Sequence, residues 1–236
     1  MNDTGTAIVW FRRDLRLTDN PALSAACEQA RHVVALYVHA PGEDGEWEPG
    51  GASRWWLHHS LAALGSALRA RGGSLCLRRG DSLGTLLEVA RETDAGRVYW
   101  NRLYDPAVVA RDTGIKAALR EAGLECESFN AALLHEPWEA RTGQGEPYRV
   151  FTPFWRSCAA RLDTLPRPLP PPAAIPAPSP APASLPLDAL DLRPRIRWDA
   201  GLHEAWTPGE AGALARVEAF ADDALARYGE GRNRPD

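Results

Sequence analysis

The chain has 236 residues, of which 44% are apolar, enough to bury one substantial core and part of a second. Its formal net charge is −4 and it has no long basic run, so the chain alone lacks the positive surplus typical of sequence-independent nucleic-acid binding. No apolar run approaches the roughly 18 residues of a membrane span. We expect no secretory leader, because the N-terminus has no basic start followed by an apolar core.

Short apolar segments alternate with helical patterns over the first 129 residues. Strands are expected at 7–11, 33–38, 74–77, 98–100 and 124–129. Between them we expect helices from Pro21 to about Gln29, at 53–71, from a cap at Ser82, and from Pro106 to Gly123. Right-handed crossovers then predict an α/β fold, a doubly wound five-stranded parallel sheet.

The sequence changes character after the fifth expected strand. We expect an α/β domain over residues 1–162, a Pro-rich connector over 163–199 and the beginning of a helical domain over 200–236. Residues 166–186 contain ten prolines, which predicts an extended, semi-rigid connector on the surface. Residues 208–228 predict one amphipathic helix, whose apolar positions are Leu214, Val217, Phe220 and Leu225.

The four cysteines are far apart and form no C-x-x-C pair. This spacing predicts reduced, mostly buried thiols in a cytoplasmic protein, with neither a disulfide framework nor a zinc site. The adjacent His58 and His59 predict no metal site either, because neighbouring helical side chains point about 100° apart. We expect one of these rings to face inward and the other to face solvent.

The first expected strand ends abruptly in charged residues. Its apolar run is followed by Arg12, Arg13, Asp14 and Arg16, just beyond the carboxyl edge of the sheet. Open α/β folds bind ligands at this edge. Two interpretations of these residues stay open: they contact a ligand, or Arg12 and Asp14 pair with each other or with loop carbonyls.

Common phosphate-binding and catalytic motifs are missing. The sequence has no G-x-G-x-x-G after the first strand, no P-loop, no G-x-S-x-G elbow and no H-E-x-x-H helix. His39 follows the second expected strand directly, so it is either a ligand contact or a loop histidine bonded to backbone. A ligand at this edge would therefore be held without the usual phosphate loop.

Three stretches resemble motifs of the DNA photolyase/cryptochrome family, class I. Residues 10–20, WFRRDLRLTDN, are similar to its opening signature, and residues 145–155, GEPYRVFTPFW, to the motif that ends its first domain. A third resemblance, to the entry into the family's flavin-binding domain, rests on Tyr228 together with Arg232, Asn233 and Pro235. The motifs occur in the family's order over essentially the whole chain.

The resemblance implies a Rossmann-like photolyase N-terminal domain and the light-driven, FAD-dependent repair of cyclobutane pyrimidine dimers in DNA. That activity, of a carbon–carbon lyase, belongs to a helical domain that these residues only begin, so no catalytic residue is assigned. Two alternatives remain: a cryptochrome-type blue-light photoreceptor, and a freestanding chromophore- or nucleotide-binding module. The implied partners are damaged DNA and a light-harvesting chromophore, and we expect a monomer.

The resemblance also implies binding residues. The antenna chromophore, methenyltetrahydrofolate or 8-hydroxy-deazaflavin, would lie against Tyr37, Val38, His39, Arg54 and Asp105. Physically, Arg54 and Asp105 could equally form an ion pair across two loops.

Three positions depart from the family's antenna patterns, and two positions match other ligands. Leu103 replaces the acidic residue of the deazaflavin type, and Ala107 and Val108 replace the Asn–Glu pair of the folate type. Tyr228 matches a tyrosine that contacts FAD, and Arg232 matches an arginine that contacts DNA.

Overall fold

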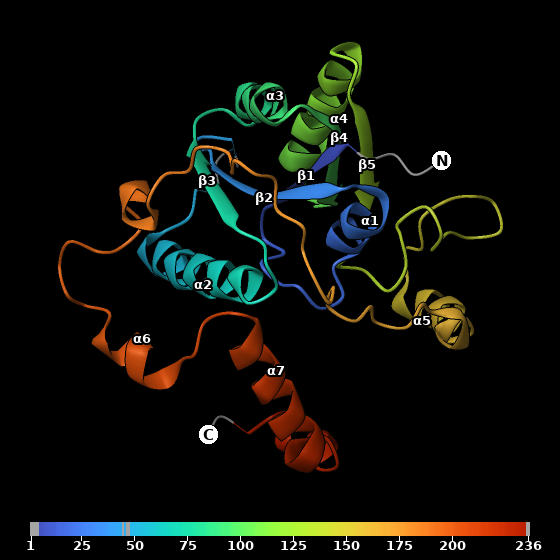
Figure 1. Ribbon diagram of the computed structural model, residues 1–236. Coiled ribbons are helices and arrows are strands. Elements are labelled where there is room, and N and C mark those ends of the chain that lie inside the picture. The colour runs from blue at the N-terminus through green and yellow to red at the C-terminus, as the bar shows by residue number, and fades with distance from the viewer. Residues whose placement is uncertain (1–4, 44, 46–47, 235–236) are drawn as a thin grey trace.

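The computed structural model describes residues 5–43, 45 and 48–234. Its centre is a five-stranded sheet in the order β3-β2-β1-β4-β5, in which all neighbouring strands are parallel (Figure 1). The strands are β1 Thr6–Phe11, β2 His32–His39, β3 Leu75–Arg79, β4 Ala95–Asn101 and β5 Glu125–Phe129. The predicted fold class is therefore confirmed.

Helices cover both faces of the sheet. Helices α1 (Pro21–Gln29) and α2 (Gly51–Arg69) lie on one face, and α3 (Ser82–Thr93) and α4 (Pro106–Glu121) lie on the other (Figure 1). Alternate residues of β1 point into the two hydrophobic cores, one on each face of the sheet. Val9 and Phe11 pack with α1 and α2, whereas Ile8 and Trp10 pack with α3 and α4. This double burial explains why β1 is an uninterrupted apolar run.

Local capping sets where these helices begin. The Oδ1 atom of Asn20 accepts a hydrogen bond of 3.1 Å from the N–H of Leu23, with Pro21 as the first residue of α1. The cap of α3 is Asp81, not Ser82 as expected; Asp81 accepts a bond of 2.7 Å from the N–H of Gly84. Ser82 instead donates through its N–H and its hydroxyl to Glu43, at 2.7 and 2.5 Å.

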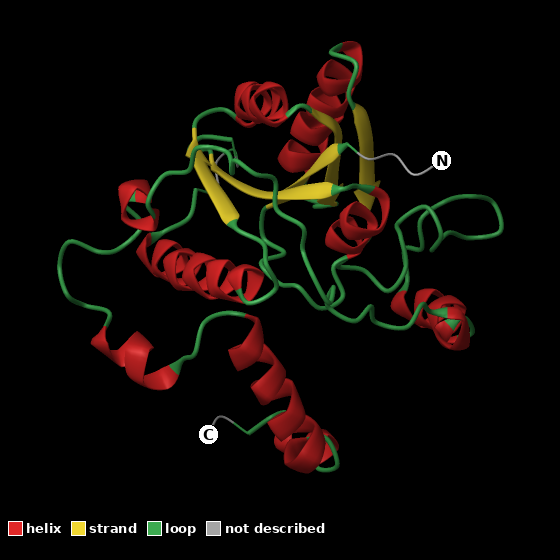
Figure 2. Ribbon diagram, in the orientation of Figure 1, coloured by secondary structure: helices red, strands yellow, loops and turns green. Residues whose placement is uncertain are grey.

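The Pro-rich connector is extended, as predicted, but it does not stay on the surface. Residues 165–186 contain no helix or strand, and they pass across the sheet beside β3 (Figures 1 and 2). Ile175 lies in the core with 1% of its surface exposed, and its N–H donates to the carbonyl of Arg71 at 2.8 Å. Leu190 and Leu192 pack on Tyr37. The packed core thus extends past residue 162, although the domain boundaries themselves stay a prediction.

The C-terminal third is helical and lies largely outside the two cores. It contains α5 (Phe151–Ala159), α6 (Ala200–Ala205), α7 (Glu210–Ala219), a π-helical turn (Phe220–Ala224) and α8 (Tyr228–Gly231), with short 3₁₀ turns at Leu162–Thr164 and Leu187–Leu190. The helix predicted over 208–228 therefore begins at Glu210 and passes into the π-helical turn at Phe220. Its apolar side chains Leu214, Val217, Phe220 and Leu225 are all exposed. Among the described residues, no helix is long and apolar enough to cross a membrane.

Candidate functional site

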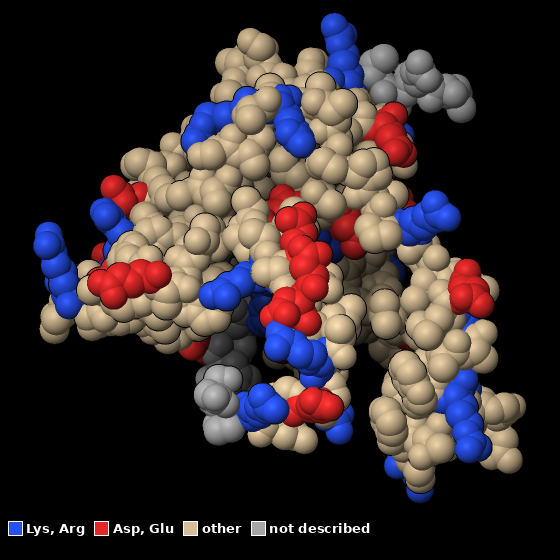
Figure 3. Space-filling view, turned by 90° about the horizontal axis from the view of Figure 1, so that it is seen from below, with Lys and Arg blue, Asp and Glu red and all other residues tan. Residues whose placement is uncertain are grey.

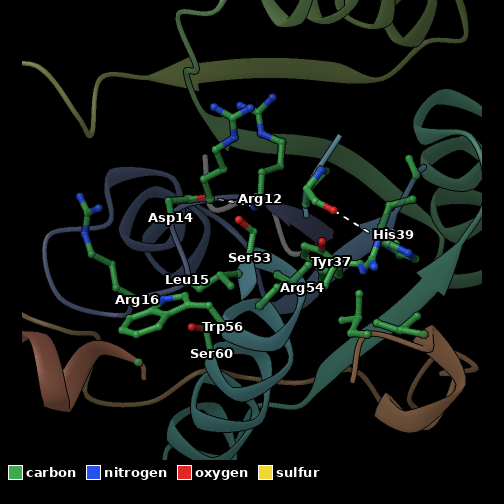
Figure 4. A pocket seen from close by; sticks show the side chains of 18 of the residues that line it. Arg12, Asp14, Leu15, Arg16, Tyr37, His39, Ser53, Arg54, Trp56 and Ser60 are labelled. Carbon is green, nitrogen blue, oxygen red and sulfur yellow. Dashed lines mark hydrogen bonds between the residues drawn. The ribbon is translucent and has the colours of Figure 1, made fainter. Parts of the chain in front are cut away.

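A cavity of about 1430 Å³ opens at the carboxyl edge of the sheet. The loop after β1, the ends of β2 and β3, the first turns of α2, residues 190–198 of the connector and helix α7 form its walls (Figure 4). Parallel strands deliver their carboxyl ends to one edge, so short loops there bring distant residues together. The cavity lies at the predicted edge of the sheet, but at the ends of β1, β2 and β3; the fourth strand, which was also expected to contribute, adds only Leu103 from the loop that follows it.

Four of the five predicted antenna residues line the cavity. Tyr37 and Val38 are nearly buried at the end of β2, His39 follows them, and Arg54 projects from the first turn of α2. Asp105 is not part of the lining. It forms an ion pair of 2.8 Å with Arg13, and both side chains are half exposed.

The alternative ion pair between Arg54 and Asp105 is not formed. Arg54 instead donates through Nη1 to the carbonyl of Pro49, at 3.3 Å. Asp105 precedes α4 without making a side-chain capping bond. Asp105 is therefore linked to the cavity only by its ion pair with Arg13, whose side chain lines the cavity.

Arg12 is a structural link between β1 and α4. Its guanidinium pairs with Asp112, donates to the backbone carbonyl of Asn101 and stacks 4.6 Å from the ring centre of Trp10. Asp14 receives a bond of 2.9 Å from the backbone N–H of Arg12, not from its side chain. Burial lowers the pKa of Arg12, and the nearby Asp112 opposes that effect. Arg12 thus makes structural pairs, but its side-chain partners are Asp112 of α4 and the carbonyl of Asn101 in β4, not Asp14 or a loop carbonyl as the sequence suggested.

His39 lies between cationic groups. Burial lowers its pKa most, Arg79 and Arg54 lower it further, and Glu48 acts in the opposite direction. With a pKa below its usual value near 6.5, the imidazole is mainly neutral at pH 7 and offers one donor and one acceptor. Arg79 ends β3 beside His39, and the sequence analysis missed it because the register of β2 and β3 was unknown.

One side of the cavity is apolar and aromatic. Leu15, Trp56, Leu57 and Trp198 contribute to it. Trp198 fits closely over the start of α2: a Cβ atom at Gly51 would lie 3.1 Å from its ring. Only the fold brings these residues together, so no local sequence signal could have identified them.

The cavity lining therefore combines apolar and aromatic side chains with several guanidinium groups. Besides Arg13 and Arg54, it includes Arg16, Arg79, Arg111, Arg193 and Arg195, together with the carboxylates of Asp14, Asp19, Glu48, Asp191 and Glu210. Such a lining suits a planar aromatic ligand that carries a negative group. On the outer face seen in Figure 3, basic and acidic side chains are interspersed, with no broad basic patch.

The remaining predicted residues lie elsewhere. Tyr228, in α8, is half exposed and packs edge-on against Phe220; neither it nor Arg232 lines the cavity. Pro235, part of the same motif, is outside the described residues. Their contacts with FAD and DNA stay predictions.

The adjacent histidines pack into the protein. His58 is buried, and His59 is partly buried against Trp55 and the ring of His203. One ring thus faces inward, as expected, whereas the other is only partly exposed instead of fully solvated. In the part of the chain that the structure describes, no three His, Cys, Asp or Glu side chains are grouped as a metal site.

Comparison with known proteins places the chain in a family. The family model described as DNA photolyase matches residues 7–178. The deoxyribodipyrimidine photo-lyase of Agrobacterium fabrum is 46% identical over 233 residues, which are 98% of this chain and 48% of that protein. Cryptochrome-1 of Arabidopsis thaliana is 40% identical over 98% of this chain and 34% of its own length.

A solved structure agrees over nearly the whole chain. It is a bacterial class III photolyase from Agrobacterium tumefaciens, with 45% identity and a TM-score of 0.92 over 99% of this chain and 48% of that one. This chain thus spans about half the length of the photolyases it matches. The family model matches well over half of the residues, and the solved photolyase shares the fold over nearly the whole chain. The chain therefore belongs to the DNA photolyase family.

Proposed function

We propose that this chain forms the antenna part of a deoxyribodipyrimidine photolyase of the class III type. Support comes from the 46% identity to the Agrobacterium fabrum photo-lyase and from the 45% identity to the structure described as class III. The sequence motifs had implied class I, and the better-matched structure favours class III. In the family-length protein, light-driven and FAD-dependent cleavage of cyclobutane pyrimidine dimers would be the reaction.

The observation that carries this proposal is the cavity that brings aromatic rings together with Arg54 and Arg79, which form no ion pair with any described residue. Methenyltetrahydrofolate and 8-hydroxy-deazaflavin are both planar ring systems, and their natural forms carry anionic groups, so the residues present fit either of them. Such a group absorbs light and passes the excitation to a flavin. The chain's own residues bind it, orient it and exclude water around it.

Each wall would contribute a distinct part of binding. Trp56 and Tyr37 offer ring faces for stacking, while Arg54 and Arg79 offer fixed positive charge beside His39. Neutral His39 can accept a hydrogen bond from a ring N–H or donate one to a ring carbonyl. Asp105 would act indirectly, by holding Arg13 at the rim.

Tyr228 and Arg232 are proposed to contact FAD and damaged DNA, respectively, in a protein of family length. Both belong to the helical segment that follows α7. A cytoplasmic, monomeric protein remains part of this proposal.

The test is a titration of the purified chain with each chromophore, followed by absorbance and by fluorescence quenching. We expect saturable binding of one of the two, and Arg54→Ala should weaken it about tenfold by removing a charge-assisted contact. Arg31→Ala is the matched control, because Arg31 lies before β2 at the opposite edge of the sheet. Equal affinities of the wild type and Arg54→Ala would remove Arg54 from the site.

A blue-light photoreceptor is the second candidate, favoured by the 40% identity to Cryptochrome-1 of Arabidopsis thaliana. The two functions share the cavity and differ in chemistry. The family-length gene product, loaded with FAD, should restore intact pyrimidines in dimer-containing DNA under blue light if it is a photolyase. Bound flavin that is photoreduced without any repair would favour the photoreceptor.

A further inference from the structure

The loop between β1 and α1 offers two consecutive backbone N–H groups to a carboxylate of α7. The N–H of Leu17 donates to Oε2 of Glu210 at 2.8 Å, and the N–H of Thr18 donates to Oε1 at 2.7 Å. Consecutive N–H groups that converge in this way form a nest for an anion. Hydrogen bonds to an ionised group are about twice as strong as neutral ones.

This loop is held in shape by other contacts, so the nest exists independently of Glu210. Arg16 donates to the carbonyls of Thr18 at 3.0 Å, Asp19 at 2.8 Å and Ala131 at 2.7 Å. The N–H of Asp19 donates in turn to the carbonyl of Leu169 at 2.8 Å. The loop that binds α7 is therefore fixed by hydrogen bonds of its own.

Helix α7 is seated at its first turn and is poorly packed beyond it. Gly209 precedes the helix with φ 103°, and a Cβ atom there would lie 2.6 Å from Cβ of Ala63 in α2, so only glycine allows this approach. Farther along, the side chains of Leu214 and Val217 are 45% and 62% exposed while they line the cavity. Apolar burial thus contributes little to the position of α7.

We propose that Glu210 is a positioning residue whose carboxylate fixes α7 on the nest of Leu17 and Thr18 and so makes α7 a wall of the cavity. The position of this wall then depends on the Glu210 carboxylate and on the close contact of Gly209 with α2, rather than on buried apolar side chains of α7. The importance of the wall for a chromophore rests on the proposed function, whereas the attachment itself does not.

Hydrogen exchange of the full 236-residue chain tests the attachment. Glu210→Gln keeps the size of the side chain but loses its charge and one acceptor. We expect exchange about tenfold faster in peptides that cover residues 15–19 and 210–219, with unchanged exchange in β1 and β2. Glu218→Gln is the control on the same helix; Glu218 is exposed, and its side chain makes no hydrogen bond or ion pair with any described residue.

The pattern of exchange decides the matter. Unchanged exchange in both peptides would overturn the proposal, and so would an increase spread over the whole sheet, because that would indicate a general loss of stability. Rescue supplies a further check: Glu210→Asp, which restores the charge on a shorter side chain, should fall between the wild type and Glu210→Gln.

Chromophore titration of the same variants separates the attachment from the proposed function. If the wild type binds chromophore, Glu210→Gln should bind about tenfold more weakly. Equal affinity together with faster exchange would overturn the role of α7 as a wall. A wild type that binds neither chromophore would contradict the proposed function, and the exchange result alone would then decide the role of Glu210.

Discussion

The side chains of Asn20 and Asn101 share a hydrogen bond of 2.8 Å in the interior of the protein, where each is 2% exposed or less. The Nδ2 atom of Asn101 also donates to Asp14 at 2.6 Å, and its Oδ1 atom accepts a bond of 3.2 Å from the N–H of Ala22. The end of β4, the loop after β1 and the start of α1 are thus joined at one buried polar point beside the cavity.

Asn101→Leu should lower the free energy of unfolding by about 2–3 kcal/mol, because it leaves buried partners of Asn101 without hydrogen bonds. Urea denaturation followed by circular dichroism measures this change. Gln144→Ala, at an exposed position, should change stability by less than about 0.5 kcal/mol. An Asn101→Leu variant as stable as the wild type would mean that water or nearby groups compensate for the lost bonds.

Ile175→Ala should cost about 2–4 kcal/mol, since Ile175 is buried in the core and a cavity would remain in its place. Leu185→Ala, at a position that is 37% exposed, is the matched control and should cost less than about 1.5 kcal/mol. By the same argument, a chain cut after Leu162 should unfold at a lower denaturant concentration than the full chain. Equal midpoints for the two chains would show that the connector only rests on the surface.

Asp105→Asn should have small effects. An exposed ion pair contributes less than about 1 kcal/mol, so stability should hardly change. Chromophore affinity should fall by less than about threefold, because Asp105 acts only through Arg13. Titration of Asp105→Asn beside Arg54→Ala provides the comparison. A loss in Asp105→Asn equal to that in Arg54→Ala would place Asp105 in direct contact with the ligand.

Stability should decrease as the pH falls through about 6.5. The pKa values of His39, His58 and His59 are all lowered in the folded chain, mainly by burial, so the unfolded chain takes up protons first. The histidine contribution is fully present above the unfolded pKa and is lost toward the lower folded pKa.

Denaturation at about pH 7.5, 6.5 and 5.5 measures this slope. His39→Gln should reduce the total loss by less than about 1 kcal/mol, because solvent reaches part of the ring. His32→Gln, at the opposite end of β2, controls for the loss of an imidazole. A steeper slope in His39→Gln would contradict the direction of the pKa change.

The purified chain of 236 residues should neither retain FAD nor repair thymine dimers under blue light. Tyr228 is half exposed and lies outside the cavity, and one tyrosine cannot enclose a ligand of that size. Flavin absorbance after gel filtration and a repair assay with irradiated oligonucleotides measure both properties. Stoichiometric flavin with light-dependent repair would show that these residues suffice for the reaction.

Local chemistry explains which features could be predicted from the sequence. Apolar runs predicted the strands β1 to β4, and Asn20–Pro21 predicted the start of α1, because both depend on neighbouring residues. The fifth strand contains Glu125 and Glu127 and was predicted without such a run. The charged run after β1 predicted one edge of the cavity. By contrast, Trp198, Arg79 and α7 reach the cavity through long-range packing, which no local pattern encodes. The burial of Ile175 could not be predicted for the same reason, because the proline-rich composition around it predicts only an extended backbone.

The path of the connector along β3 also affects how the protein behaves in a crowded solution. The N–H of Leu185 donates to the carbonyl of Leu77 at 2.9 Å, and the hydroxyl of Ser184 accepts a bond of 2.9 Å from the N–H of Leu77. Exposed edge strands invite pairing with other chains, and proline cannot continue a ladder of hydrogen bonds. Pro182 and Pro186 flank these contacts, so the connector covers the edge of β3 with a segment that cannot itself template a further strand. The proline-rich segment thereby protects this side of the sheet against edge-to-edge aggregation.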